Sequence, residues 1–246
     1  MLHPKHRCAI ALFRLTCIAS FIGAATWGAE AAGAAAAPQP PDTMAARMEA
    51  CTPCHGDQGQ GTSDVYFPRL AGKPAGYLAN QLLAFQEGRR KYAPMNYLLE
   101  FQTDQYLRQM AEYFSALRPP PLTPAQPSVS NAVLAQGRAL VERGNPGRGV
   151  PPCSGCHGPK LTGMEPGIPG LVGLRAPYIS AQLGAFRYGT RTAAAPDCMQ
   201  FVAASLSEAD VTAVAAYLAS LPVPADPSAL PQGRLTMPLP CGSEPK

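Results

Sequence analysis

Apolar side chains recur along this chain every three or four positions, the spacing that places them on one face of an α-helix. Three such stretches lie between residues 44 and 118, and three more follow between residues 131 and 222. The pattern predicts an all-α chain with three helices and long loops in each half. The stripes are Met44, Arg47, Met48 and Cys51; Tyr77, Leu78, Gln81, Leu82 and Phe85; Tyr106, Leu107, Met110, Phe114 and Leu117; Val133, Leu134, Gly137, Leu140 and Val141; Tyr178, Ile179, Gln182, Leu183 and Phe186; Val211, Val214, Ala215, Leu218 and Leu221.

Local signals mark the ends of several of these helices. Pro74 precedes and Gly88 follows the second stripe, and Thr103 is placed as the N-cap of the third. The run Ser207-Glu208-Ala209-Asp210 resembles a capping box at the start of the last helix. We therefore expect the helices to begin or end at these residues.

The two halves are copies of one another. Shifted by 101 residues, the segment from Phe67 to Arg90 is identical to its counterpart at 11 of 24 positions. Pro119-Pro120-Pro121-Leu122-Thr123-Pro124 lies between the halves and predicts a stiff, extended linker. The identical pairs are Pro68/Pro169, Leu70/Leu171, Gly72/Gly173, Ala75/Ala176, Tyr77/Tyr178, Gln81/Gln182, Leu82/Leu183, Ala84/Ala185, Phe85/Phe186, Gly88/Gly189 and Arg90/Arg191.

Each half contains one C-x-x-C-H pentapeptide, Cys51-Thr52-Pro53-Cys54-His55 and Cys153-Ser154-Gly155-Cys156-His157. This spacing is typical of covalent haem c attachment, in which two thiols add to the vinyl groups and the adjacent imidazole reaches the iron. One helical turn can present all three groups to the porphyrin. The alternative is a single zinc site made of four thiolates, which would leave both His unused. Two covalently attached haems are the prediction.

The first 37 residues resemble a secretory signal. Lys5 and Arg7 form a basic start, residues 8–25 are mostly apolar, and small residues follow from Gly28 to Ala37. Cleavage would place the protein in the periplasm; an uncleaved membrane anchor is the alternative. The expected organisation is a signal at 1–37, an N-terminal domain at 38–118, a linker at 119–130, a C-terminal domain at 131–222 and a Pro-rich tail at 223–246.

Composition fits small domains that depend on a bound group. Hydrophobic residues make up 46% of the 246 residues but aromatic residues only 7%, with 23 Gly and 28 Pro. Loss of residues 1–37 would lower the formal charge from +4 to +2. The densest basic run, Arg89-Arg90-Lys91, is too short for a nucleic-acid surface. It is either a solvated loop or a contact for a partner or a haem propionate.

The sixth iron ligand is the next question. Apart from His3 and His6 in the expected signal, the only His are those of the two motifs, which excludes ligation by two His from this chain. Met95 and Met199 lie 40 and 42 residues after their motif His, in the loop between the second and third helices. A neutral thioether favours ferrous iron and fills the last coordination position, as a one-electron carrier needs. Packing in the core is the other role open to both Met.

Cys198 and Cys241 belong to neither motif. In an oxidising compartment two remaining Cys usually pair, and this bridge would tie the tail beside the second Met loop. Inert thiols are one alternative. Iron ligation by Cys198, or its reaction with a sulfur substrate, is the other.

Together these motifs resemble the di-haem cytochrome c4 family, in which two class I cytochrome c domains stand in tandem. The resemblance covers about residues 41–221 and includes an aromatic near the end of each last helix, Tyr113 and Tyr217. It implies His55 and His157 as proximal ligands, with Met95 and Met199 as distal ones. It also implies that the carbonyls of Pro68 and Pro169 accept a hydrogen bond from these imidazoles. The chain departs from the family at an insertion (144–152), a longer second Met loop containing Cys198, and its tail.

Three functions are compatible with these residues. The first is a periplasmic carrier that passes single electrons between respiratory components, from a quinol–cytochrome c reductase or similar donor towards a terminal oxidase. The second is an electron-accepting subunit of a periplasmic dehydrogenase for an alcohol, an aldehyde or thiosulfate. The third, a catalytic di-haem enzyme, is disfavoured because no His remains outside the two haem motifs and because each half has a Met in its loop. The expectation is a carrier with no catalytic residue and no nucleic-acid partner, meeting a membrane only through its partners or an uncleaved signal.

Overall fold

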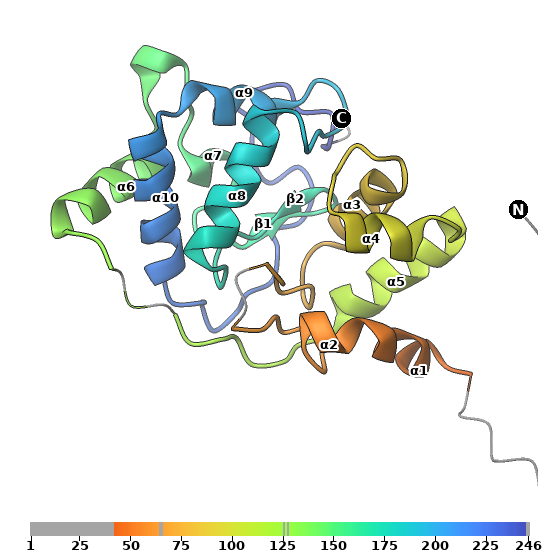
Figure 1. Cartoon of the computed structure of the whole chain (residues 1–246). Coiled ribbons are helices and arrows are strands. Elements are labelled where there is room, and N and C mark those ends of the chain that lie inside the picture. The colour runs from red at the N-terminus through yellow and green to blue at the C-terminus, as the bar shows by residue number, and fades with distance from the viewer. Residues whose placement is uncertain (1–41, 64–65, 125, 127, 245–246) are drawn as a thin grey trace, which may run out of the picture. The chain divides into compact units, whose positions relative to one another are not determined.

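The computed structural model describes residues 42–63, 66–124, 126 and 128–244. The expected signal at 1–37 lies outside the described residues. From residue 42 onward the described chain belongs to one compact unit (Figure 1). Among these residues no single helix is long and apolar enough to cross a membrane; α9 (Cys198–Ser205) and α10 (Glu208–Ser220), bent by 113°, pass that test only as a pair.

The first half forms short helices around the haem motif and longer ones after it. Thr43 caps the first helix through its side chain, and Thr103 caps the last by accepting from Tyr106 N at 3.2 Å, as predicted. Gly88 follows the central helix with φ +71°, a conformation that favours glycine. The elements are α1 (Met44–Met48), a 3-10 turn (Glu49–Cys51), α2 (Thr52–His55), α3 (Ala75–Gln86), α4 (Ala93–Leu99) and α5 (Asp104–Ala116).

The second half repeats this order and adds a small hairpin. Its two strands are antiparallel, with Gly163 opposite Pro169 and Met164 opposite Ile168. The capping box predicted at Ser207 and Asp210 is present at the start of the last helix. The elements are α6 (Asn131–Arg143), a 3-10 turn (Pro146–Arg148), α7 (Cys153–His157), β1 (Gly163–Met164), β2 (Ile168–Pro169), α8 (Ala176–Arg187), α9 (Cys198–Ser205) and α10 (Glu208–Ser220).

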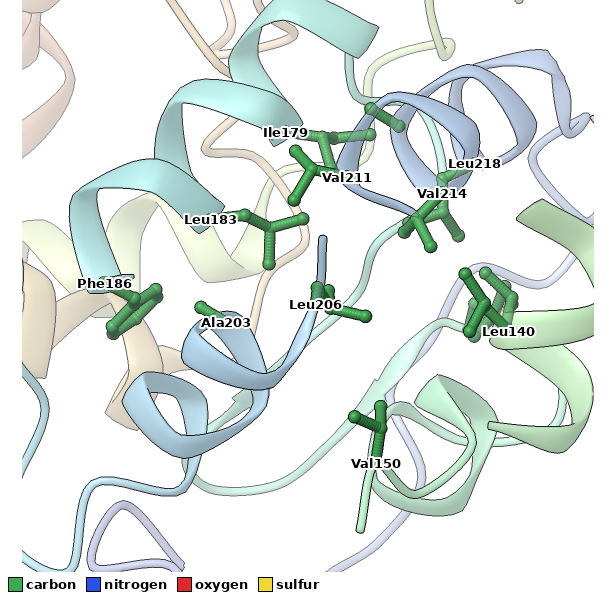
Figure 2. Packing of buried hydrophobic residues seen from close by; sticks show 13 residues of the cluster. Leu140, Val150, Ile179, Leu183, Phe186, Ala203, Leu206, Val211, Val214 and Leu218 are labelled. Carbon is green, nitrogen blue, oxygen red and sulfur yellow. The ribbon is translucent and has the colours of Figure 1, made fainter. Parts of the chain in front are cut away.

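The core of the second half lies where α6, α8, α9 and α10 meet (Figure 2). Leu140 of α6, Leu183 of α8 and Leu218 of α10 are buried together there. Gly137 allows α6 and α10 to cross closely, because a Cβ at that position would lie 2.1 Å from the Ala213 carbonyl oxygen. Burial of these apolar side chains is the main stabilising contribution, at about 25 cal/mol per Å² removed from water.

Both Met segments are helical rather than loops, which corrects the sequence prediction. Met95 lies in α4, which has Pro94 in its first turn, and Met199 lies in α9, whose N-cap Asp197 accepts from Gln200 N at 2.9 Å. Proline is tolerated in the first turn, where its missing N–H would be unpaired anyway. Asn96 also ties α4 to the preceding turn by donating to the Arg90 carbonyl at 2.9 Å.

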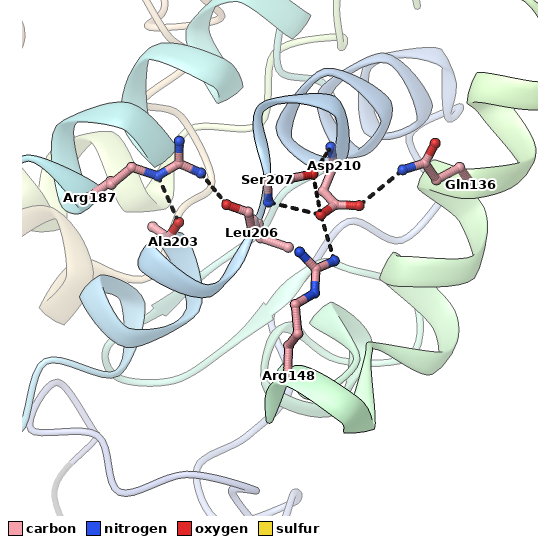
Figure 3. Close-up of polar contacts among 7 residues, drawn as sticks. All are labelled: Gln136, Arg148, Arg187, Ala203, Leu206, Ser207 and Asp210. Carbon is pink, nitrogen blue, oxygen red and sulfur yellow. Dashed lines mark hydrogen bonds and ion pairs between the residues drawn. The ribbon is translucent and has the colours of Figure 1, made fainter.

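The insertion at 144–152 is anchored to the last helix rather than projecting freely. Arg148 in its 3-10 turn donates to Asp210 at 2.6 Å. Gln136 of α6 donates to the same carboxylate at 3.0 Å, and Ser207 donates through both N and Oγ (Figure 3). Burial by itself would raise the pKa of Asp210, but these hydrogen bonds outweigh it and hold the pKa far below its usual value.

The two halves meet through the repeated Tyr, Gln and Arg. The Arg90 guanidinium donates to Gln81, Gln182 and Tyr178 at 3.1, 2.9 and 3.0 Å. The Arg191 guanidinium donates to Gln182, Gln81 and Tyr77 at 2.8, 2.7 and 3.1 Å. Exchanging the two halves converts one contact set into the other. The two copies of the repeat are therefore related by an approximate two-fold axis at the interface.

Backbone bonds and ring contacts complete this interface. Lys91 N donates to the Thr190 carbonyl at 2.9 Å, and Thr192 N donates to the Arg89 carbonyl at 2.8 Å. Arg90 lies over the Phe85 ring at 4.5 Å, as Arg191 lies over Phe186 at 4.4 Å. Arg90 is only 9% exposed. For this residue the solvated-loop interpretation is wrong, because its charge points into the interface.

The Pro-rich segments are held by specific contacts. Arg69 donates to the carbonyls of Pro119 and Pro120 at 2.8 and 3.1 Å, which fixes the linker against the first half. The tail runs along the hairpin, where Leu230 N donates to the Gly163 carbonyl at 2.9 Å. A disulfide then joins Cys241 to Cys198, with their Cα atoms 5.0 Å apart.

Candidate haem-binding sites

Each C-x-x-C-H motif ends in a buried His whose ring is held by a backbone carbonyl. His55 Nδ1 lies 2.9 Å from the Pro68 carbonyl oxygen, and His157 Nδ1 lies 2.7 Å from that of Pro169. A carbonyl oxygen only accepts, so Nδ1 carries the proton and Nε2 keeps its lone pair. The imidazoles are 8% and 6% exposed. These are the contacts that the family resemblance implies, and they prepare Nε2 to bind a metal.

The electrostatic surroundings keep both imidazoles neutral. Burial lowers the pKa of His55, and the charge of Arg90 lowers it further. Burial likewise lowers the pKa of His157, with Lys73 adding to the effect. The hydrogen bonds to the proline carbonyls act in the opposite direction but do not reverse the result. A neutral imidazole is the form that ligates iron.

The second half encloses an apolar cavity that brings the predicted site residues together. His157 and Cys156 line it from α7, and Met199 lines it from α9. Pro169 and the adjoining hairpin form part of the wall, while α8 supplies apolar side chains such as Leu183. Four tail residues complete the lining: Met237, Leu239, Cys241 and Ser243.

Met95 of the first half packs against Phe85, Leu99 and Leu107. Its motif His55 lies near the ring of Phe67, with ring centroids 6.3 Å apart. The pairing of Met95 with His55 therefore depends on the equivalence of the two halves, whereas His157 and Met199 share one cavity.

The cysteines divide into two kinds. Cys51, Cys54, Cys153 and Cys156 are free thiols in the structure, and burial raises the pKa of Cys153 to about 11. Among the described residues no group of three or more His, Cys, Asp or Glu side chains is placed to hold a metal ion, so these thiols do not gather into one zinc site. The predicted pairing of Cys198 with Cys241 is confirmed. Their sulfurs are therefore not available as iron ligands or nucleophiles while the bridge is intact.

The interface carries buried positive charge that needs a counter-ion. None of the ion pairs between described residues includes Arg90, Arg191 or Lys73. Burial would raise the pKa of Tyr77, but these three cations outweigh it and lower the pKa to about 8. Arg191, Lys73 and Tyr77 also line the cavity. Haem propionates are carboxylates that would satisfy this excess charge, so the residues present fit the group.

Sequence reasoning did not identify the cavity residues that come from the other half. Lys73, Tyr77, Asn80 and Gln81 of the first half all line the cavity that contains His157. The available signal was the repetition of Tyr and Gln on otherwise apolar helices and of the Arg that follows each of them. Polar residues that recur at matched positions of a repeat can lie at the interface between the two copies or on a solvent-exposed face.

Comparisons with known proteins agree with this geometry. A family model for cytochrome c matches residues 135–222. The chain is 37% identical to the thiosulfate dehydrogenase electron acceptor of Thiomonas intermedia, covering 82% of this chain and 88% of that one. It is also 37% identical to cytochrome c4 of Pseudomonas aeruginosa, covering 78% and 91%.

A solved structure shows the same fold. Reduced recombinant cytochrome c4 from Pseudomonas stutzeri superposes with a TM-score of 0.63 at 33% identity, covering 72% of this chain and 96% of that one. The C-x-x-C pairs at Cys51/Cys54 and Cys153/Cys156 supply the attachment points for two covalent haem c groups. By its two haem sites, its tandem fold and the near-complete coverage of these relatives, the chain belongs to the di-haem cytochrome c4 family of electron-transfer cytochromes.

Proposed function

We propose that this cytochrome is a periplasmic one-electron carrier in which each iron is held between a His and a Met, His55 with Met95 and His157 with Met199. The observation that carries the proposal is the shared cavity of His157, Cys156 and Met199. Its residues come from α7, which contains the second C-x-x-C-H motif, and from a separate helix, α9. The haem supplies a reversible Fe(III)/Fe(II) couple when bound.

The protein's own residues prepare that couple. Pro68 and Pro169 orient the imidazoles through their carbonyl oxygens. Met95 and Met199 would fill the sixth position, so that little bond rearrangement accompanies gain or loss of an electron. Apolar side chains such as Leu183 and Phe186 exclude water from the second cavity. No described His remains to serve as a general base.

Spectroscopy of the holoprotein tests the axial ligands. We expect a methionine-to-iron charge-transfer absorption in the oxidised protein, which Met95→Ala and Met199→Ala should each reduce by about half. Each variant should also let one of its two reduced haems bind carbon monoxide, while the parent protein binds little. Met110→Ala is the control, because Met110 packs in the helical core. Unchanged absorption in either ligand variant would contradict the assignment.

The direction of electron flow is proposed from the sequence family. The favoured role passes electrons from a reductase or dehydrogenase towards a terminal oxidase. A thiosulfate-oxidising donor is the specific alternative, because the relative from Thiomonas intermedia is described as a thiosulfate dehydrogenase electron acceptor and shares 37% identity. Both roles use the same two haem sites and differ only in the partner.

Direct mixing distinguishes these partners. The oxidised holoprotein would be mixed in a stopped-flow instrument with a purified thiosulfate dehydrogenase plus thiosulfate, and separately with a quinol–cytochrome c reductase plus quinol. Fast haem reduction only in the first mixture would assign the dehydrogenase role, and fast reduction only in the second would assign the respiratory role. Omission of thiosulfate or quinol gives the matched blank.

A further inference from the structure

One residue breaks the two-fold pattern of the interface beside the second haem site. The repeat pairs Tyr77 with Tyr178, Gln81 with Gln182 and Arg90 with Arg191. Lys73, four positions before Tyr77, instead corresponds to Leu174 when the halves are aligned. The aligned position of the second half therefore carries no cation, although the neighbouring Arg175 lines a separate small pocket with Pro68 of the first half.

Lys73 reaches across the interface to the other half. Its Nζ donates to the Gly170 carbonyl at 3.0 Å. Gly170 directly follows Pro169, whose own carbonyl accepts from His157 at 2.7 Å. Lys73 also lines the cavity that contains His157 and Met199. It belongs to the first half of the chain but stands in the wall of the second haem site.

The charge of Lys73 is not neutralised by a protein carboxylate. Its Nζ donates to a neutral carbonyl, and no ion pair between described residues includes it. Burial lowers the pKa of Lys73, whereas Tyr77 acts to raise it.

We propose that Lys73 is a tuning residue that raises the reduction potential of the second haem and leaves that of the first nearly unchanged. Reduction adds one electron to the iron, so a nearby fixed cation stabilises the reduced form relative to the oxidised form. Leu174 at the equivalent position exerts no such effect on the first haem. The inference rests on the two-haem assignment and holds whichever protein donates the electrons.

The test is a redox titration of the full holoprotein followed by visible absorption, comparing Lys73→Met with the parent. Met has similar length and no charge. A unit charge within about 10 Å in a medium of effective dielectric constant about 20 changes an equilibrium by roughly tenfold. For one electron that corresponds to about 59 mV. We expect the second haem to become harder to reduce by an amount of this order, with the first haem unmoved.

Two further variants separate charge from packing. Lys73→Arg should keep the parent potentials, and Lys91→Met, the same change at an exposed lysine, should also leave them unchanged. Met199→Ala in the Lys73→Met background identifies which titration step belongs to the second haem.

The outcomes are decisive in both directions. A drop confined to the second haem and restored by Arg supports the proposal. It would be overturned by unchanged potentials in Lys73→Met, by equal shifts of both haems, or by a shift that Lys73→Arg reproduces. Loss of the methionine absorption in the parent would instead refute the proposed ligands, so the two failures remain distinguishable.

Discussion

Asp210 shows how much one side chain connects in the second half. Its carboxylate accepts from Ser207, Gln136 and Arg148, and so links α10 with α6 and with the insertion at 144–152. The side chain is 7% exposed, so loss of its charge would leave its donors without a good acceptor.

We expect Asp210→Asn to lower the free energy of unfolding at pH 7 by about 2 kcal/mol, the usual cost of losing a buried charge-assisted bond and part of a cap. The hydrogen bonds lower the folded-state pKa, so the carboxylate stabilises the protein above the ordinary pKa of about 4. That contribution falls as the pH drops further. Urea denaturation at pH 7 and pH 3 should therefore show a smaller difference between variant and parent at pH 3.

The control for this prediction is Glu208→Gln. Glu208 pairs with Arg187 next to the same helix start, but its side chain is 83% exposed. We expect only a small change in stability from it. An equal loss in both variants, or a difference between Asp210→Asn and the parent that is constant with pH, would contradict the role given to Asp210.

The sequence predicted half of this arrangement. Ser207 and Asp210 are three positions apart, so their reciprocal bonds follow from a local capping pattern. Arg148 and Gln136 lie 62 and 74 positions away from Asp210. No local rule assigns partners at that distance, because the fold alone brings them together.

At the scale of elements, α9 carries Met199 and the disulfide side by side. Cys198 starts the helix and Met199 follows it, while Cys241 holds the tail against the same turn. The bond closes a separation of 43 residues. The tail and helix α9 are therefore covalently joined where they line the second cavity.

Removing the disulfide with Cys198→Ala and Cys241→Ala together should lower the free energy of unfolding by about 4 kcal/mol on the chain-entropy model. The freed tail should be cut sooner by a protease, and the second haem should bind carbon monoxide more readily than the first. Limited proteolysis and gas binding by the reduced protein measure both effects. A tail that stays resistant in this variant would show that its other contacts suffice.

Sequence reasoning missed helices α4 and α9 as well as the small β1–β2 hairpin. Each helix is short, at 7 and 8 residues, which is too few turns for a clear apolar stripe. Pro94 reads as a loop signal, although it occupies a first turn where proline is accepted. The longer helices were predictable because their stripes cover three turns or more and because each appears twice.

At the scale of the whole molecule, the sequence revealed the repeat but not how its copies face one another. The polar residues Tyr77, Gln81 and Arg90 are interspersed with apolar residues. From the sequence they could lie on a solvent-exposed face as well as in an interface. Their partners Tyr178 and Gln182 lie 88 and 92 positions from Arg90. Only a two-fold pairing of the halves gives every one of these polar groups a partner and places Lys73 beside the second haem site.

Because the two arginines make equivalent contacts, Arg90→Met and Arg191→Met should cost similar amounts, about 2 kcal/mol each, by leaving buried glutamine and tyrosine oxygens without their donors. The two arginines share Gln81 and Gln182 as acceptors, so the double variant should lose less than the sum of the single losses. Guanidinium denaturation followed by absorption and circular dichroism measures the losses in the single and the double variants.

Once both arginines are gone, the halves should unfold in separate steps, since the contacts that couple them are broken. Arg89→Met is the matched control, because the Arg89 side chain is 39% exposed and forms an ion pair with Glu87. A single cooperative transition in the double variant would mean that the linker and the backbone hydrogen bonds between residues 89–91 and 190–192, rather than the arginines, hold the two halves together.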